Sequence, residues 1–240
     1  MPEERLRVVL INYTPNPEET IALAGRLCYS PVGVPQLREK MSDEEKKKLL
    51  KLLLAGGHHS PLEHANFTFA IEGISRACSH QLVRHRIASY SQQSQRYVSA
   101  SDFGYIIPPE IAKDDELKAS FIEDMRRFVQ RYEFYVERLL AKGRDREQAQ
   151  EDARFVLPNA AETKIVVSMN ARELIHASNV RLCLRAQWEI RRLFEAVKKE
   201  VAVVAPTIAA YMVPKCDDKI LGYCPEGKMS CGLVKTRKPS

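Results

Sequence analysis

The strongest constraint on the fold is the regular spacing of apolar residues between Asp115 and Gly143. Apolar side chains recur there at gaps of three and four, which places them on one face of an α-helix. An acidic residue precedes the pattern and Gly143 follows it, so we predict one long helix with a single buried face. The residues of this face are Leu117, Phe121, Met125, Phe128, Tyr132, Tyr135 and Leu139.

The remaining elements are predicted from periodicity and from the residues at element ends. Ser42 and Glu45 have the spacing of a capping box, and Asn170 and Glu173 repeat it. Further helices are predicted over 17–29, 42–56, 74–86, 147–155, from 170 onward, and 186–204. Strands are predicted over 7–12, 66–72 and 163–168. The segment 58–64 is predicted to be loop, and 89–95 loop or extended chain. Gly73 is expected to end the second strand.

This order predicts an α/β (α+β) chain with a mixed sheet and several long helices. Helices and strands alternate too irregularly for a doubly wound nucleotide fold, and no G-x-G-x-x-G follows a strand. The chain has 240 residues, which suits a single catalytic domain, 1–213, followed by a cysteine-containing tail, 214–240. The N-terminus has no signal-peptide pattern and no stretch is apolar enough to span a membrane, so we expect a cytoplasmic protein without a membrane partner.

The predicted tail carries three of the six cysteines: Cys216, Cys224 and Cys231. Their spacing differs from the C-x2-4-C pairs common in zinc sites, and no C-x-x-C occurs in the chain. A cytoplasmic chain mostly keeps its thiols reduced. The sequence leaves three outcomes open for this tail: bound zinc, a disulfide, or free thiols.

A window without acidic residues runs from Gly73 to Ser101, and it contains four arginines, four glutamines and a run of hydroxyls. Arginine binds phosphate through paired hydrogen bonds and stacks on planar rings. Glutamine and serine supply donors and acceptors for the edge of a base or a heteroaromatic ring. The window therefore predicts a site for a phosphorylated ligand that carries a ring, and the net charge of +6 agrees with an anionic ligand.

The centre of the window reads Arg84-His85-Arg86, then seven residues, then Ser94. This segment resembles the R-H-R-x7-S signature of the flavin-dependent thymidylate synthases, in the extended form that ends Ser-x-Arg-Tyr. The resemblance covers the chain from about Val8 to Met212. It implies conversion of dUMP to dTMP with a one-carbon unit from 5,10-methylenetetrahydrofolate, with NADPH as reductant through bound FAD, in a homotetramer with shared active sites.

The resemblance also implies the residues that contact dUMP. Arg96 and Arg154 are expected at the phosphate, and Arg181 at the uracil. The full expected set is Gln81, Arg84, Gln92, Gln93, Ser94, Gln95, Arg96, Arg154 and Arg181. Gln92 and Ser91 stand where many members of the family have glutamate and asparagine.

FAD contacts are implied at three places: the loop 57–64, the signature, and the segment that begins Asn170-Ala171-Arg172. The loop contains three histidines and a carboxylate, but its spacing is neither H-E-x-x-H nor H-x-x-E-H, so no metal is expected there. The expected FAD set is His58, Ser60, Glu63, Arg84, His85, Arg86, Ser91, Gln92, Asn170, Arg172 and His176.

Arg181 and Ser94 are the candidate catalytic residues. Serine is a poor nucleophile without an adjacent base, so we expect Ser94 to position the substrate rather than attack it. We expect Arg181 to stabilise negative charge on the uracil as N3 loses its proton.

Two alternatives remain open at this point. A basic nucleic-acid-binding protein would bind broadly, with steep salt dependence and no chromophore. A flavoprotein that binds uridylate without methyl transfer would be yellow but would form no dTMP.

Overall fold

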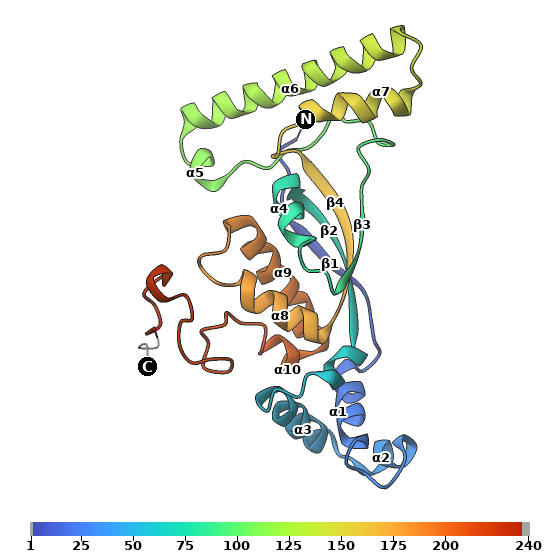
Figure 1. Cartoon of the computed structure of the whole chain (residues 1–240), viewed down its shortest axis with the longest axis vertical. Coiled ribbons are helices and arrows are strands. Elements are labelled where there is room, and N and C mark those ends of the chain that lie inside the picture. The colour runs from blue at the N-terminus through green and yellow to red at the C-terminus, as the bar shows by residue number, and fades with distance from the viewer. Residues whose placement is uncertain (1, 237–240) are drawn as a thin grey trace. The chain divides into compact units, whose positions relative to one another are not determined.

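The computed structural model of the protein describes residues 2–236, and Figure 1 shows its helices and strands. Four strands form one sheet in the order β1-β2-β4-β3. The elements are β1 (Arg7–Tyr13), α1 (Pro17–Leu27), α2 (Val34–Lys40), α3 (Asp43–Ala55), η1 (Ser60–His64), β2 (Asn66–Ser75), α4 (Arg76–Leu82), β3 (Ala88–Gln92), α5 (Pro109–Ala112), α6 (Asp115–Ala141), α7 (Arg146–Ala153), η2 (Arg154–Val156), β4 (Glu162–Asn170), α8 (Ala171–Arg181), α9 (Trp188–Val204), α10 (Pro206–Ala209) and η3 (Gly227–Met229).

Contacts between β2 and β4 define an antiparallel pair. The hydroxyls of Thr68 and Ser168 lie 2.9 Å apart, and the N–H of Gly73 donates to the Glu162 carboxylate at 3.0 Å. Residue numbers thus rise along one strand as they fall along the other. Alternate side chains of β4 are buried, as a half-covered sheet requires. The predicted α/β class is confirmed, but the sheet is antiparallel rather than the predicted mixed sheet.

The chain forms two compact units. The first contains residues 2–7, 71–84 and 90–166, and α6 is its longest helix, with 27 residues. In this unit α7 packs back against α6 (Figure 1). Tyr132 of α6 is fully buried with Ala153 of α7, and Met125 is buried as well. The predicted apolar face is confirmed only in part, because its residues Leu117, Phe128 and Tyr135 are exposed.

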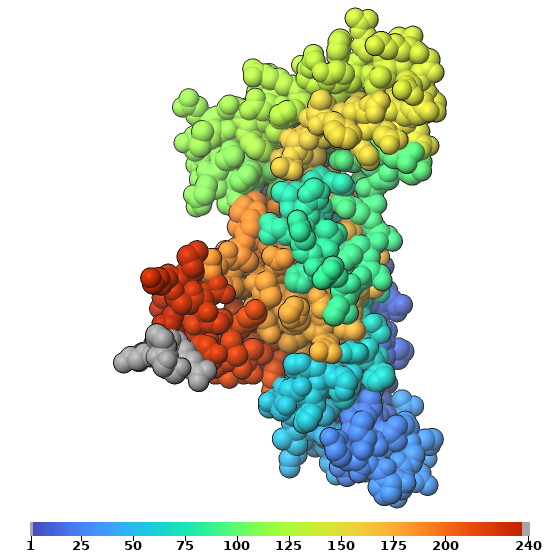
Figure 2. All heavy atoms as spheres, viewed as in Figure 1, coloured from blue at the N-terminus to red at the C-terminus, as the bar shows by residue number. Residues whose placement is uncertain are grey.

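The second unit contains residues 8–70, 85–89 and 167–236. Here α1 packs against α3 and η1, and α9 packs against α8 and α10. The side chains of Ile21, Leu50 and Phe194 are almost completely buried in its core. Figure 2 shows the C-terminal segment, in red, against the orange α8–α9 part of this unit. A hydrogen bond from Lys215 N–H to the Asn179 carbonyl joins that segment to α8.

Several element boundaries differ from the sequence predictions. The strand predicted over 66–72 continues through Gly73 to Ser75, and the helix predicted over 74–86 is limited to α4. The segment 58–64 contains a 3-10 helix rather than only loop, and α2 was not predicted. The polar run 89–95 is extended in its first part, as β3.

The residues that cap the helices were predicted more accurately than the ends of the strands and helices. Ser42 and Glu45 form both hydrogen bonds of a capping box, and the Asn170 side chain accepts from Glu173 N–H at 2.9 Å. Within residues 2–236, no helix is long and apolar enough to cross a membrane. The division into a catalytic domain 1–213 and a tail 214–240 remains a prediction, and residues 237–240 of that tail lie outside the described part of the chain.

Candidate active site

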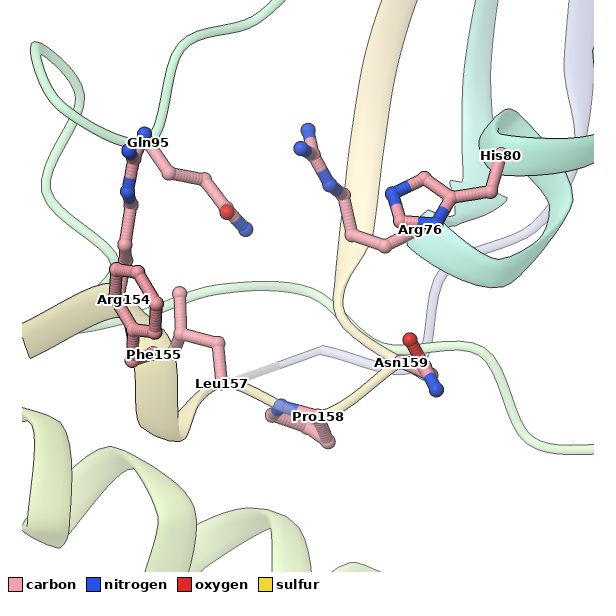
Figure 3. Close-up of a pocket in the computed structure, with 8 residues that line it drawn as sticks. All are labelled: Arg76, His80, Gln95, Arg154, Phe155, Leu157, Pro158 and Asn159. Carbon is pink, nitrogen blue, oxygen red and sulfur yellow. The ribbon is translucent and has the colours of Figure 1, made fainter. Parts of the chain in front are cut away.

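A cationic cavity of about 370 Å³ lies in the first unit. Arg76 and His80 come from α4, Gln95 follows β3, and Arg154 begins η2. In Figure 3 the Arg76 guanidinium and the Gln95 amide point into the same space, with His80 beside Arg76. The other lining residues are Phe155, Leu157, Pro158 and Asn159. This volume is within the range of small-molecule sites.

The cavity has positive charge that the protein does not neutralise locally. Its lining contains no carboxylate, and within residues 2–236 neither Arg76 nor Arg154 forms an ion pair. Burial lowers the pKa of Arg76, and the charge of Arg154 lowers it further. Because arginine stays protonated in proteins, these two guanidinium groups favour an anion between them.

The glutamines and serine of the signature lie in and after β3. Gln92 Nε2 donates to the hydroxyls of Ser79 and Thr163 at 3.0 and 3.1 Å, and Gln93 N–H donates to the Lys164 carbonyl at 2.9 Å. The Ser94 hydroxyl accepts from Arg96 N–H at 3.1 Å, which is the geometry of a turn. The structure thus places Gln92 to Gln95 on one continuous stretch, with Gln92 and Gln93 bonded to α4 and β4.

Arg96 has acidic partners that the acid-free window did not indicate. Its guanidinium forms an ion pair with Glu147, and its Nε lies 3.1 Å from the Glu151 carboxylate. Both glutamates come from α7, about fifty residues along the chain. The charge of Arg96 is therefore already opposed within the protein, in contrast to Arg76 and Arg154.

In the second unit, His85 lies between Glu173 and Arg181. Arg181 Nε donates to His85 Nε2 at 2.9 Å, and His85 Nδ1 lies 3.3 Å from the Glu173 carboxylate. The side chains of His85 and Glu173 are only 7% and 5% exposed. Burial, together with the charges of Arg181 and His176, lowers the pKa of His85 to about 4. Because its own pKa is lowered well below 7, the imidazole is neutral near pH 7. Burial also raises the pKa of Glu173.

A second cavity, of about 490 Å³, lies in the same unit as this trio. Its lining combines apolar side chains with Arg172, Glu173 and His176 of α8, and with His59, Ile87 and Tyr211 from other segments. The Arg172 guanidinium is paired with the Glu63 carboxylate at the surface. Apolar walls with a few polar groups suit a planar heteroaromatic ligand.

Comparisons with known proteins show the family to which the chain is similar. Residues 9–207 match the protein family described as "Thymidylate synthase complementing protein". The flavin-dependent thymidylate synthase of Clostridium tetani is 51% identical over 97% of this chain and 96% of its own length. Those of Geobacter sulfurreducens and Pyrococcus furiosus are 50% and 44% identical, over 95% and 97% of this chain and 94% and 96% of their own lengths.

The chain belongs to the flavin-dependent thymidylate synthase family. This membership favours an enzyme over the nucleic-acid-binding alternative. The residues expected for dUMP lie in the first unit, apart from Arg181. Those expected for FAD lie in the second, apart from Arg84, Ser91 and Gln92. In the triplet Arg84-His85-Arg86 of the signature, the two arginines are exposed and the histidine is buried.

Other expected residues are placed as follows. His58, Ser60 and Glu63 are exposed in and before η1, and the side chain of Asn170 is engaged as the cap of α8. Gln81 is half-buried on α4. The sequence did not indicate Arg76, His80 or Glu173 as site residues. The residues that share the cavity with Arg76 and His80, and those that contact Glu173 in the trio, are distant from them in the chain. The absence of carboxylates around Arg76 was the one signal that could have indicated it.

Among residues 2–236, the three cysteines of the C-terminal segment form no disulfide. Cys216 and Cys224 line a cavity of about 250 Å³ together with Cys183, Arg181 and Arg185. Among residues 2–236, no group of three or more histidine, cysteine or acidic side chains is arranged to hold a metal ion. Burial and the neighbouring thiols raise the pKa of Cys216, so this thiol stays protonated near pH 7.

Proposed function

We propose that the protein catalyses the reductive methylation of dUMP to dTMP, with 5,10-methylenetetrahydrofolate as carbon donor and NADPH as reductant. The observation that carries this proposal is the complete R-H-R-x7-S signature, together with a cavity lined by two arginines that form no ion pair among residues 2–236. The family membership supports the same reaction.

The cavity of the first unit supports a binding mode for the nucleotide. The phosphate of dUMP binds between Arg76 and Arg154, where its charge relieves the repulsion of the two guanidinium groups. The side-chain amides of Gln95 and Asn159 also line this cavity and can donate hydrogen bonds to the nucleotide. The other expected contacts, Gln81, Arg84, Gln92, Gln93 and Ser94, remain the dUMP set that the family resemblance implies.

The residues of the second unit suit FAD. The cavity lined by Arg172 and His176 has the apolar walls and the cation that a flavin or adenine ring with a phosphate requires. FAD supplies the two-electron reduction when it is bound. His58, Ser60, Glu63, Asn170, Arg172 and His176 are the residues of this unit that we propose hold it, with Arg84, His85, Arg86, Ser91 and Gln92 of the signature.

The protein's own contribution to the chemistry is electrostatic. Arg181 stabilises the negative charge that develops on the uracil N3–C2=O2 edge, so that C5 becomes nucleophilic without a covalent bond to the enzyme. Ser94 positions the nucleotide, which agrees with its engagement in the turn before Arg96. The fixed donors hold the substrate in a reactive orientation and so lower the entropy cost of the reaction.

We also propose a homotetramer with shared active sites, in the cytoplasm. Support comes from apolar side chains that the single chain leaves exposed, including Ile11 and Tyr13 of β1 and Phe155, which is 83% exposed beside the cationic cavity. Association of copies would cover such residues.

An absorbance spectrum of the purified protein tests the function first. We expect the bands of oxidised flavin, bleaching under anaerobic NADPH faster with dUMP than without it, and dTMP formation once 5,10-methylenetetrahydrofolate is added. Flavin reduction without dTMP would instead support the flavoprotein that lacks methyl transfer. A colourless protein that takes up no FAD would overturn the proposal.

A further inference from the structure

Three side chains of the second unit form a continuous line of hydrogen-bonding groups: Glu173, His85 and Arg181. The separations are 3.3 Å between Glu173 and His85 Nδ1 and 2.9 Å between His85 Nε2 and Arg181 Nε. Glu173 lies in the first turn of α8 and Arg181 in its last, while His85 belongs to the signature. One helix therefore supplies both ends of the line, and the histidine connects them.

The chemistry of arginine fixes the state of the histidine. Arg181 Nε always carries hydrogen, so His85 Nε2 must be the acceptor. The single ring hydrogen of the neutral imidazole is then on Nδ1, where it points at the Glu173 carboxylate. Phe194 and His176 lie beside the ring, with centroid distances of 5.9 and 6.4 Å, and limit its rotation.

The bond to Nε also restrains the arginine. Nε is the guanidinium nitrogen nearest the main chain, and an acceptor at a fixed place on Nε–H sets the plane of the whole planar group. A buried ring between two neighbours is a more rigid acceptor than a surface side chain or water. The direction in which Arg181 presents its terminal nitrogens thus depends on His85, and through it on Glu173.

We propose that Glu173 is a positioning residue of this enzyme: it selects the His85 tautomer that holds Arg181 in the orientation needed at the uracil. The inference rests on the proposed function, because it assumes that Arg181 acts on the nucleotide. Glu173 also lines the cavity proposed for FAD, but its link to the nucleotide runs through His85 and Arg181. Its effect on turnover passes through the histidine and the arginine.

A double-mutant cycle tests the coupling. Glu173→Ala should lower kcat by about a hundredfold, since a misplacement of about 1 Å can cost that much. In an Arg181→Ala background the same change should lower kcat by less than about threefold, because the group it positions is already absent. Glu173→Gln keeps an oxygen that can accept from Nδ1–H, and should retain most of the activity. Independent losses in the two backgrounds would overturn the proposal.

Glu162→Ala is the matched control. Glu162 is also a carboxylate whose pKa burial raises, but it belongs to the first unit and accepts from Gly73 N–H. The decrease in kcat caused by Glu162→Ala should be the same with and without Arg181→Ala. Thermal unfolding of every variant shows whether stability is lost. If Glu173 has a purely structural role, Glu173→Ala should lower kcat by the same factor with and without Arg181.

A crystal structure of Glu173→Ala provides a readout independent of activity. The bond from Arg181 Nε to His85 Nε2 should be lost or redirected in this variant and kept in Glu173→Gln. If the unsubstituted protein forms no dTMP, the proposed function fails, yet this structural comparison still decides whether Glu173 controls Arg181. An unchanged Arg181 in the alanine variant would refute the positioning role even if the enzyme is active.

Discussion

At the scale of single residues, the arginines around the signature differ in what already neutralises them. Arg96 is held by two glutamates of α7, whereas Arg76 and Arg154 face a cavity without a carboxylate. An anion that binds Arg96 must compete with these glutamates, but one that binds Arg76 meets no such competitor. Free positive charge, rather than the mere presence of arginine, therefore indicates the phosphate position.

This difference gives a testable ranking of Arg76 and Arg96. Arg76→Gln should raise KM for dUMP by about ten- to a hundredfold, because a charge-assisted bond to phosphate contributes about 1.5–3 kcal/mol. Arg96→Gln, the matched control, should raise it less. With deoxyuridine, which lacks the phosphate, Arg76→Gln should change KM little. Steady-state kinetics with both substrates measures this, and equal effects of Arg76→Gln on the two would exclude a phosphate contact.

At the scale of elements, β2 depends on a single glycine. Gly73 has φ +67° inside the strand, and a Cβ there would lie 2.0 Å from the Arg5 carbonyl oxygen and 2.4 Å from the Arg5 carbonyl carbon. Both contacts are with backbone, which cannot turn aside as a flexible side chain can. The strand therefore continues through a residue that local sequence rules treat as a break.

Gly73→Ala should consequently prevent stable folding or lower the free energy of unfolding by several kcal/mol. Gly143→Ala is the control, since Gly143 also has positive φ, +81°, but a Cβ there meets nothing within 4 Å. The control should lose only the cost of the left-handed backbone, about 1–2 kcal/mol. Urea unfolding of both variants measures the difference. Similar losses would mean that the contact with Arg5 contributes nothing.

These elements also show what the sequence could predict. Signals that act within one turn were more reliable. Ser42 and Glu45 form the predicted capping box, and Asn170 caps α8, but the Glu173 side chain lies against His85 and does not complete the second predicted box. The ends of elements that depend on distant contacts were not predictable from sequence. The end of β2 is an example, because the approach of Arg5 to Gly73 is a tertiary contact. The site follows the same rule. The signature residues were found from their spacing, but Arg76 is paired with Arg154 only by the fold.

At the scale of the whole molecule, buried ionisable groups couple stability to pH. The pKa of His85 is lowered from 6.5 to about 4, so the unfolded chain binds a proton in this window that the folded protein does not. Stability from this group is therefore present above pH 6.5 and lost as pH falls toward 4. Glu162 and Glu173 act in the opposite sense, since their raised pKa values favour the folded state at low pH.

His85→Asn isolates the histidine contribution. The stability difference between the unsubstituted protein and this variant should shrink as pH falls from 6.5 to 4, by about 3 kcal/mol at most, at about 1.4 kcal/mol for each pH unit. Arg181, His176 and Glu173 face the ring and are present in both proteins, so their own charges are common to the comparison. Denaturant unfolding at several pH values measures it. Parallel curves for the two proteins would assign the acid sensitivity to other groups.

The division of the chain into two units has a consequence for working with the gene. Each unit is assembled from three separate stretches of sequence, and two of the points at which the chain passes from one unit to the other, 84/85 and 89/90, lie inside the signature itself. No single cut in the gene therefore yields a fragment that contains all of one unit and none of the other. Truncation libraries and split-protein reporters built on this chain should fail at every break point within 71–166, whereas fusion partners belong at the ends.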